Sequence, residues 1–460
     1  MHSQSLLAFS RQIPVRHDVD VFVAGGGPAG VAAAVTAARQ GAHVLLVEGQ
    51  SCCGGSGTAG MLPVFMRFGD RAHFYADGIG REVLERLERG GGIWPTKDMP
   101  QPCYKGEVLK RVYDDMLEGS GAEVLLCTKL VAVEARAGRV THAVCWGKSG
   151  LFAVQAKVFV DGTGDGDLCA WAGAPFEKGD EQGNMMPGTL CSFWSGVNWK
   201  KADAAGVGAW QQESHLPRAF KRKVFTIEDH HLPGMVPTGK TTGGGNIGHT
   251  FGVDGTDERS LTRAHRWARK SLVEYQRFYR EFLKGYEHAE MSVSAPLMGV
   301  RESRRIVGDY VLCKPDFETQ AAFPDEIGRF NYWIDIHCTT PAKKEFQAHM
   351  KLRRVSPYKD GESYGIPYRC LVPKKLHNVL VAGRCVSTDR WLQSSIRVMP
   401  ACFITGQAAG MAAAMASKQG HSARQVDVAK LQARLVKMGA CLPNLHQPRE
   451  KTCIRPSAQH

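Results

Sequence analysis

The stretch DVDVFVAGGGPAGVAAAVTAARQGAHVLLVEGQ, residues 18–50, decides the fold. A short apolar run rich in β-branched residues, 19–24, predicts a buried parallel strand. Glycines follow in a Gly-x-Gly-x-x-Gly pattern, and residues 29–40 have the composition of a helix. A second apolar strand is predicted over residues 43–47, closed by Glu48. Together these elements predict a Rossmann-like α/β unit that binds a dinucleotide.

Each glycine of this turn has a mechanical reason. Gly25 permits the tight turn, Gly27 lets a pyrophosphate approach the backbone, and Gly30 lets helix and strand pack closely. The helix N-terminus directs free N–H groups and the positive end of its dipole at the phosphates. Glu48 follows at about the 20-residue spacing expected of the acid that accepts a hydrogen bond from a ribose hydroxyl.

Two later segments repeat the pattern of an apolar strand followed by glycines. Residues 158–160 lead into the turn Gly-Thr-Gly-Asp at 162–165, and residues 379–382 lead into Gly383-Arg384. A helix of small residues is predicted over 401–417, after Met399-Pro400. The nucleotide-binding unit therefore draws on the beginning, the middle and the end of the chain.

Bulk composition excludes several classes. The chain has 460 residues and a formal charge of +13, which invites an anionic partner but comes without a nucleic-acid-binding motif. Much of the charge is expected on the solvated face of a long amphipathic helix over 257–283. The 14 cysteines include no Cys-x-x-Cys pair, and the 17 histidines show no metal-ligand spacing, so we predict no metal site. With no membrane span and no secretory signal, we expect a cytoplasmic protein.

The chain resembles FAD-dependent oxidoreductases of the large two-dinucleotide-binding flavoprotein clan, which holds the succinate dehydrogenase and fumarate reductase flavoprotein subunits. More narrowly, it resembles a bacterial family that pairs GGGPAG with GVRESRR, residues 299–305, and with AGR, RVMP and GQAAG, within residues 382–410. The resemblance runs from Arg11 to Leu442. It implies an FAD cofactor and an α/β fold.

The resemblance also implies a domain plan. A glutathione-reductase-like, Rossmann-like FAD-binding domain would comprise residues 1–185 and 370–420. An α+β substrate or cap domain would be inserted over residues 186–369, and residues 421–460 would form a C-terminal helix and tail.

The cofactor contacts that the resemblance implies are spread over most of the chain. They are Gly25, Gly27, Pro28, Ala29 and Gly30 at the pyrophosphate, Glu48 at the adenosine ribose, Val131 at the adenine, Gly164 and Asp165 at the second turn, Gly55, Ser56 and Thr58 along the ribityl and flavin side, and Gly383, Arg384, Met399, Gly406 and Gln407 at the flavin end. A helix N-terminus at the flavin would stabilise negative charge on the reduced ring.

Candidate catalytic residues lie in the inserted region. In NYWIDIHCTT, Asp335 and His337 share one face of a predicted strand, and a carboxylate beside an imidazole makes a general base. A polar strand face toward solvent is the alternative. His249, in a glycine-rich loop, serves either a substrate or its own loop.

We consider two hypotheses for the role of the arginines in VRESRR. In the first, Arg301 or Arg304 points into the flavin cleft and grips an anion, while Glu302 and Arg305 hold the frame. In the second, the whole segment is a salt-bridge knot between domains.

The expected reaction is hydride transfer between a small polar substrate and flavin N5, by oxidation of a hydroxyl, an amine or a C–C bond. The expected partner is a small molecule. If that molecule is anionic, an arginine could bind it. Nucleic acid and membrane are not expected partners, and homo-oligomerisation and the electron acceptor stay open. The alternatives are an RNA-modifying flavoprotein and a flavin subunit of an electron-transfer complex.

Overall fold

The predicted first strand lies in the middle of a large, mostly parallel sheet. A computed structural model describes Leu7 and residues 10–94, 101–355, 358–420 and 422–446. The large sheet has the order β5 (Glu123–Leu125), β2 (Val44–Val47), β1 (Val15–Ala24), β8 (Gly150–Asp161), β7 (Arg139–Gly147) and β6 (Lys129–Arg136), with β17 (Val379–Val381) also paired to β8. The predicted Rossmann-like α/β fold is confirmed.

The register brings the ends of three strands together. β1 is parallel to both β2 and β8, with Val23 opposite Leu46 and Val160. β8 is long enough to pair with the antiparallel β7 along its first half and with the parallel β17 at its end. The predicted glycine turns after β1, β8 and β17 therefore meet at one edge of the sheet, where parallel sheets bind their ligands.

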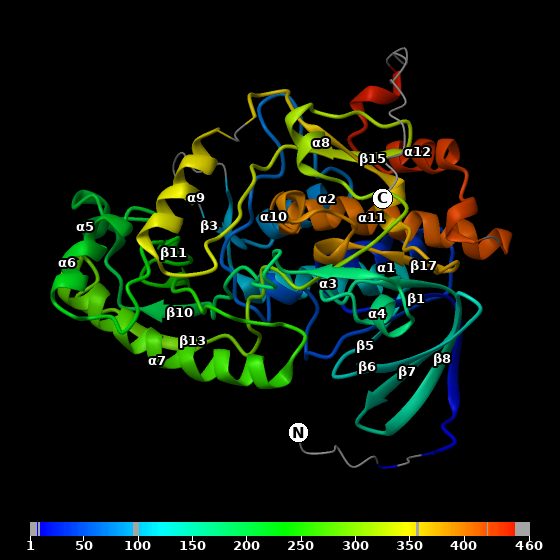
Figure 1. The fold of residues 1–460 in the computed structure, drawn as a ribbon, viewed down its shortest axis with the longest axis horizontal. Helices are drawn as coiled ribbons and strands as arrows, with labels where there is room; N and C mark the ends of the chain where they lie inside the picture. The colour runs from blue at the N-terminus through cyan, green and yellow to red at the C-terminus, as the bar shows by residue number, and fades with distance from the viewer. Residues whose placement is uncertain (1–6, 8–9, 95–100, 356–357, 421, 447–460) are drawn as a thin grey trace.

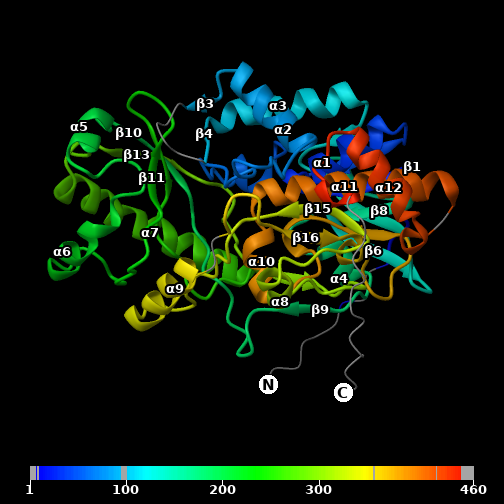
Figure 2. The same ribbon diagram turned by 90° about the horizontal axis from the view of Figure 1, so that it is seen from above.

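Two helices of small residues cross each other on this sheet. α1 (Pro28–Arg39) and α11 (Met399–Gln419) are both almost entirely buried. A Cβ atom added at Gly406 or Gly410 would lie 2.2 Å from the backbone oxygen of Ala29 or Ala33, respectively. The two glycines of GQAAG thus let the helices touch backbone to backbone. Figures 1 and 2 show α1 and α11 next to each other.

A second core lies at the far end of the molecule, drawn in green in Figures 1 and 2. It is built by side chains between Leu190 and Met298 around the long helix α7 (Glu258–Phe282). The Asp257 carboxylate accepts a hydrogen bond from Ser260 N and caps α7, which confirms the predicted amphipathic helix.

The second core takes up only part of the predicted inserted region, residues 186–369. Ile306, Phe330 and Tyr364 belong to the core of the large sheet rather than to the second core. The reason is that the chain returns to the sheet directly after the arginine segment, through β14 (Arg304–Ile306). The strand expected in NYWIDIHCTT, residues 331–340, is not formed, and residues 307–312, after β14, make only isolated bridges.

The remaining elements frame these two cores. The further strands are β3 (Ile93–Trp94), β4 (Cys103–Tyr104), β9 (Phe176–Lys178), β10 (Ser192–Ser195), β11 (Gly234–Pro237), β12 (Gly243–Asn246), β13 (Glu290–Ser294), β15 (Glu326–Phe330) and β16 (Tyr364–Pro367). The further α-helices are α2 (Ile79–Arg89), α3 (Gly106–Ser120), α4 (Asp167–Trp171), α5 (Trp199–Ala204), α6 (Leu216–Lys221), α8 (Lys314–Glu318), α9 (Lys343–Val355), α10 (Arg390–Ile396) and α12 (Val428–Lys437). The expected C-terminal helix is α12, and the expected tail, residues 447–460, lies outside the described residues.

Within the described ranges, no single helix is both long enough and apolar enough to cross a membrane. α10 and α11 reach that length and composition only when they are joined, and they meet at 94°.

Candidate functional site

The first glycine turn has the geometry that a dinucleotide needs. Gly25 has a φ of +88°, and a Cβ there would lie 2.7 Å from the oxygen of Gly162. Glu48 closes β2 and accepts hydrogen bonds of 2.7 Å from the backbone nitrogens of Gly26 and Gln50. The acid is therefore fixed beside the turn, with lone pairs left for a hydroxyl.

The turn is also open where a pyrophosphate would approach. A Cβ added at Gly27 would meet only the Gly162 oxygen, 4.0 Å away. No side chain caps the N-terminus of α1 at Gly27, so its first N–H groups are available to an anion. Pro28 and Ala29 form the first turn of that helix. An FAD pyrophosphate fits this position.

The second glycine turn is held by a buried acid that the sequence patterns did not single out. Asp161, at the end of β8, accepts hydrogen bonds from Thr163 and from Cys169 N. Beyond it, Gly164 adopts a φ of +79°. The Asp165 carboxylate pairs with Arg384 at 2.8 Å, which ties this turn to the turn after β17.

The loop with Gly55, Ser56 and Thr58 lies between the first turn and α11. Gly54 N donates to Gly26 O at 2.7 Å, and a Cβ at Gly57 would lie 2.9 Å from Met399 Sδ. The loop therefore spans from the phosphate turn to the start of α11, the path that a ribityl chain and a flavin require.

At the flavin end, the expected start of the helix is corrected. α11 begins at Met399, with no side-chain cap at Val398, so its free N-terminus lies there and not at Gly406. Gly406 packs against Ala29 two turns further on. The Gln407 side chain accepts a hydrogen bond of 2.7 Å from Ile79 N and so caps the start of α2, while its contact with the flavin stays a prediction.

Val131, the implied adenine contact, lies in β6 at an irregularity of the β6–β7 ladder. It is partly exposed. Nearby, Thr128 N donates to Glu48 O, so this strand starts beside the ribose acid.

A cluster of buried polar side chains lies where the second core meets the start of α11. Its members come from separate segments between α6 and α11. The buried ones are Asp229, His231, His249, Arg301, Asp335, His337 and His349, and the partly exposed one is Arg397. Arg397 directly precedes α11, and its Nη2 donates to Asp335 O at 3.1 Å and lies 3.2 Å from Asp335 Oδ2. The cluster is thus tied to the expected flavin end.

Four of these groups form a line. Asp229 Oδ2 lies 3.1 Å from His249 Nδ1, and His249 Nε2 lies 2.9 Å from His337 Nδ1. His337 Nε2 lies 3.4 Å from Asp335 Oδ2. The contact of His249 Nδ1 with Asp229 has the distance of an ion pair but not the alignment of a hydrogen bond, whereas the other two contacts are hydrogen bonds. The line therefore has a negative charge at each end and two imidazoles between them.

Electrostatics oppose a permanent imidazolium in the cluster. Burial, and next the charge of Arg301, hold the pKa of His337 well below its usual value. Burial, and next the charge of His249, do the same to the pKa of His231. Burial acts to raise the pKa of Asp229, but the charge and hydrogen bonding of His249 outweigh it and lower that pKa. Anionic Asp229 and neutral His231 and His337 are favoured.

Arg301 is buried against the same cluster. Its Nη1 donates to Pro187 O and to Thr189 Oγ1, each at 2.8 Å. Burial, with the charge of Arg397, lowers the pKa of Arg301 to about 10, so it is charged at neutral pH. Its Nε and Nη2 have no acceptor among the described residues, so this side of the guanidinium can accept an anion.

Arg304 lies apart from this cluster, and the other charges of the segment form a knot. Arg304 Nη1 lies 2.6 Å from Asp167 Oδ1 beside the second glycine turn. The fully buried Glu302 pairs with Arg305 at 2.8 Å and with Arg390 at 3.2 Å. The ion pairs of Glu302, Arg305 and Arg390 match the second hypothesis. Arg301 is the only arginine of the segment in the cluster, and its binding of an anion at the flavin stays a prediction.

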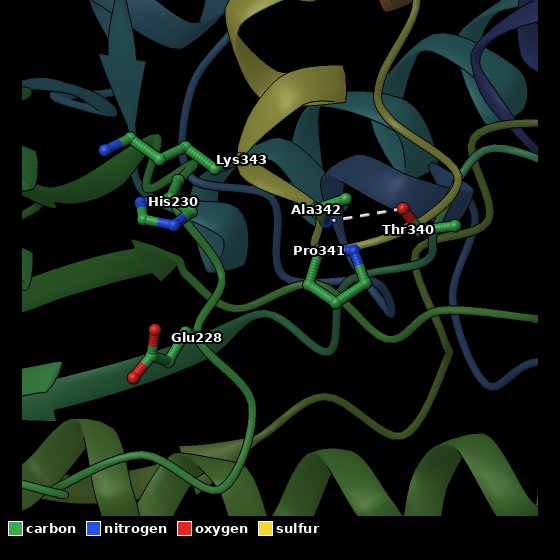
Figure 3. Close-up of a pocket in the computed structure, with 6 residues that line it drawn as sticks. All are labelled: Glu228, His230, Thr340, Pro341, Ala342 and Lys343. Atoms are coloured by element: carbon green, nitrogen blue, oxygen red, sulfur yellow. Dashed lines mark hydrogen bonds between the residues drawn. The ribbon is translucent and has the colours of Figure 1, made fainter.

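An open cavity of about 660 Å³ lies beside the cluster. Figure 3 shows its lining, which consists of Glu228, His230, Thr340, Pro341, Ala342 and Lys343. These residues are chain neighbours of Asp229, His231 and His337. A small molecule therefore has solvent-accessible space close to the buried polar groups.

The sequence patterns missed Asp229, His231 and Arg397. Asp229 and His231 stand in the segment EDHHLP, and Arg397 in SSIRVMP. Two adjacent histidines after an acid, and an arginine before the helix, were the available signals. Neither pattern tells which distant segment packs against it.

The family model described as FAD dependent oxidoreductase matches residues 20–435. An uncharacterized protein in the nifH2 5' region of Methanosarcina barkeri is 27% identical over 186 residues, which cover 37% of this chain and 96% of that protein.

Several solved structures align over most of the chain. A geranylgeranyl bacteriochlorophyll reductase-like protein of Thermoplasma acidophilum is 12% identical, with coverages of 92% of this chain and 83% of that chain and a TM-score of 0.46. The p-nitrophenol 4-monooxygenase of Pseudomonas putida is 11% identical, with coverages of 92% of this chain and 87% of that chain and a TM-score of 0.44. The L-proline dehydrogenase of P. horikoshii is 11% identical, with coverages of 92% of this chain and 99% of that chain and a TM-score of 0.42.

Proposed function

Since the chain belongs to the FAD-dependent oxidoreductase family, we propose that it is a dehydrogenase that transfers hydride between a small anionic substrate and flavin N5. The substrate carries a hydroxyl or an amine on the carbon that gives up hydride, and a carboxylate or comparable anionic group. Bound FAD supplies the two-electron acceptor.

The cofactor is held by the three glycine turns and the start of α11. The pyrophosphate lies against Gly25, Gly27 and the first turn of α1, and Glu48 accepts from the adenosine ribose. The free N-terminus of α11 at Met399 faces the flavin. Two features support this fit: the uncapped ends of α1 and α11, and a buried Arg397 Nε that has no hydrogen-bond partner among the described residues.

The observation that carries the substrate class is Arg301. It is 8% exposed, charged, and bonded on one side only to Pro187 and Thr189. Asp335 and Asp229 attract this charge, but neither makes a hydrogen bond to the guanidinium among the described residues. A substrate carboxylate held by its free edge would supply that direct ion pair. Arg397 adds a second positive charge beside it.

The histidines supply the remaining half of the reaction. Oxidation of H–C–O–H to C=O releases one hydride and one proton. The hydride leaves for the flavin, and the proton is withdrawn at the cluster of His249 and His337. Asp229 and Asp335 at the two ends of the line fix the imidazole rings.

Anaerobic absorption spectroscopy tests this proposal. The purified protein, loaded with FAD, is mixed with a panel of hydroxy acids, amino acids and uncharged polyols. We expect the flavin bands to bleach with an anionic compound. Arg301→Gln should retain FAD and lose the bleaching, whereas Arg369→Gln, whose arginine pairs with Asp325 at the surface, should behave as the unaltered protein.

Two results would contradict the proposal. One is bleaching by uncharged polyols alone. The other is equal bleaching in Arg301→Gln and in the unaltered protein.

A further inference from the structure

Three buried histidines face one another in the cluster. His231, His249 and His337 each offer a ring nitrogen, and the three nitrogens all lie within 4.8 Å of one another. The sequence predicted no metal site, because the ligands come from three segments and no spacing along the chain reveals them. His231 lies before β11, His249 follows β12, and His337 follows β15.

The backs of two of these rings are supported by acids. Asp229 Oδ2 lies 3.1 Å from the Nδ1 of His249, and Asp335 Oδ2 lies 3.4 Å from the Nε2 of His337. Asp229 also accepts hydrogen bonds from the backbone nitrogens of His231 and His249, at 3.0 and 3.2 Å. A carboxylate behind a ligating imidazole fixes its tautomer and raises its basicity toward a metal ion.

The ring hydrogens of His249 and His337 also favour a cation between the two rings. If His249 gives its N–H to Asp229 and His337 gives its N–H to Asp335, then His249 Nε2 and His337 Nδ1 are both lone pairs. These two atoms face each other at 2.9 Å. Two lone pairs at that distance repel unless a cation lies between them.

We propose that His231, His249 and His337 bind a divalent transition-metal ion, of the class that takes neutral imidazole ligands, with Asp229 and Asp335 as its outer support. Zinc and ferrous iron belong to this class. Two imidazole nitrogens on a tetrahedral zinc ion lie about 3.3 Å apart, so the rings need to open by only a few tenths of an ångström. The ring nitrogens of the three histidines converge closely enough to share a metal ion. Burial, in contrast, opposes an imidazolium at His231 and at His337.

The ion gives the cluster its chemistry. Three protein ligands leave at least one coordination position for an oxygen or nitrogen of a small molecule. In this part the inference rests on the proposed function and replaces its proton acceptor. With the three histidines bound to the ion, the ion would lower the pKa of the substrate hydroxyl or amine, and the proton would leave to solvent while the hydride leaves to the flavin. The ion itself changes no oxidation state. Asp229 and Asp335 balance its two charges, and the surplus from Arg301 and Arg397 matches an anionic substrate.

Titration of the FAD-loaded full chain with Co²⁺, after removal of metals with a chelator, tests the site. We expect one Co²⁺ per chain, with visible ligand-field absorption and a raised Tm. His249→Ala and His337→Ala should each weaken binding by at least about 100-fold. Asp229→Asn should weaken it by about 10- to 100-fold, as expected of an outer-sphere partner.

His230→Ala is the matched control, because His230 is adjacent to His231 and lines the open cavity without belonging to the cluster. It should bind Co²⁺ as the unaltered chain does. Full FAD content in every variant shows that a loss of Co²⁺ is not a loss of folding. If a histidine variant fails to retain FAD, anomalous diffraction from Co²⁺-soaked crystals of the unaltered chain decides instead.

The proposal is overturned if the unaltered chain binds no Co²⁺ at one equivalent, if the histidine variants bind it undiminished, or if the anomalous peak lies elsewhere. Binding is read without turnover, so the two proposals fail separately. Flavin bleaching without Co²⁺ binding overturns only the metal site, and Co²⁺ binding without bleaching overturns only the proposed reaction.

Discussion

The glycine turns and the histidine cluster both lie near the start of α11, but they are built from different parts of the chain: the first from backbone, the second from side chains. The turns consist of backbone, with N–H groups, glycines and two helices of small side chains in contact. The cluster consists of side chains from loops, held by ion pairs such as Asp335 with Arg397. A backbone site depends on close packing, whereas a side-chain site depends on a balance of charge. The two regions should therefore fail in different ways.

The largest effect is expected from breaking the backbone side. Gly406→Val places side-chain atoms where a Cβ alone would lie 2.2 Å from Ala29 O, so α1 and α11 must separate. We expect a loss of more than about 3 kcal/mol in the free energy of unfolding, with loss of FAD. Denaturant unfolding measures this.

Gly119→Val in α3 is the matched control, since a Cβ at Gly119 meets no atom within 4 Å. It should change the free energy of unfolding by less than about 0.5 kcal/mol. Equal losses in the two variants would refute the packing role of Gly406.

Breaking the side-chain side should leave the protein folded and yellow. Arg301→Gln removes a charge that the proposed substrate needs, so we expect kcat/KM for the bleaching compound to fall by about 10²- to 10³-fold at unchanged FAD content. Stopped-flow reduction of the flavin measures it. A variant that loses FAD and activity together would show that Arg301 serves the cofactor.

The cluster should also make stability depend on pH. His231 and His337 have folded-state pKa values well below 6.5. Below pH 6.5 the unfolded chain therefore binds protons that the folded chain does not, and stability falls by about 1.4 kcal/mol per pH unit for each histidine. Above that pH these two groups contribute no slope. Denaturant unfolding of the metal-free protein measures the slope.

The double variant His231→Asn with His337→Asn should flatten this acid slope. A slope that is the same with and without the two histidines would mean that other groups carry it.

The smallest effect is expected at Gln407, and it tests whether this residue belongs to the cofactor site. Gln407→Leu removes the hydrogen bond to Ile79 N at the start of α2, for an expected loss of about 1–2 kcal/mol in stability. FAD affinity should not change. An affinity loss of tenfold or more, measured by fluorescence titration of the apoprotein, would place Gln407 among the flavin contacts.

The same contrast explains what the sequence could predict. A backbone site is contiguous, so GGGPAG with Glu48 predicted its turn, its helix and its second strand. Gly406 was misplaced because a glycine that serves helix packing looks like one that serves a ligand. His249, Arg301, Asp335 and His337 were singled out one at a time by local chemistry, but their meeting depends on how the second core packs on the sheet.

Two partners in the cluster had weaker signals still. His231 and Arg397 act only through neighbours far away in the chain, so no spacing marks them. The point at which the chain returns to the large sheet had no local signal for a related reason. Burial of Ile306 in the core of the large sheet depends on β14, a strand too short to recognise.

The most direct test is a crystal structure of the protein with FAD and a small carboxylate bound. The account predicts the adenosine at Glu48, the isoalloxazine at the start of α11, and the carboxylate on Arg301 with its reacting carbon about 3–3.5 Å from flavin N5. An isoalloxazine that points away from Arg301 and the three histidines would contradict it, because the two regions would then not form one site.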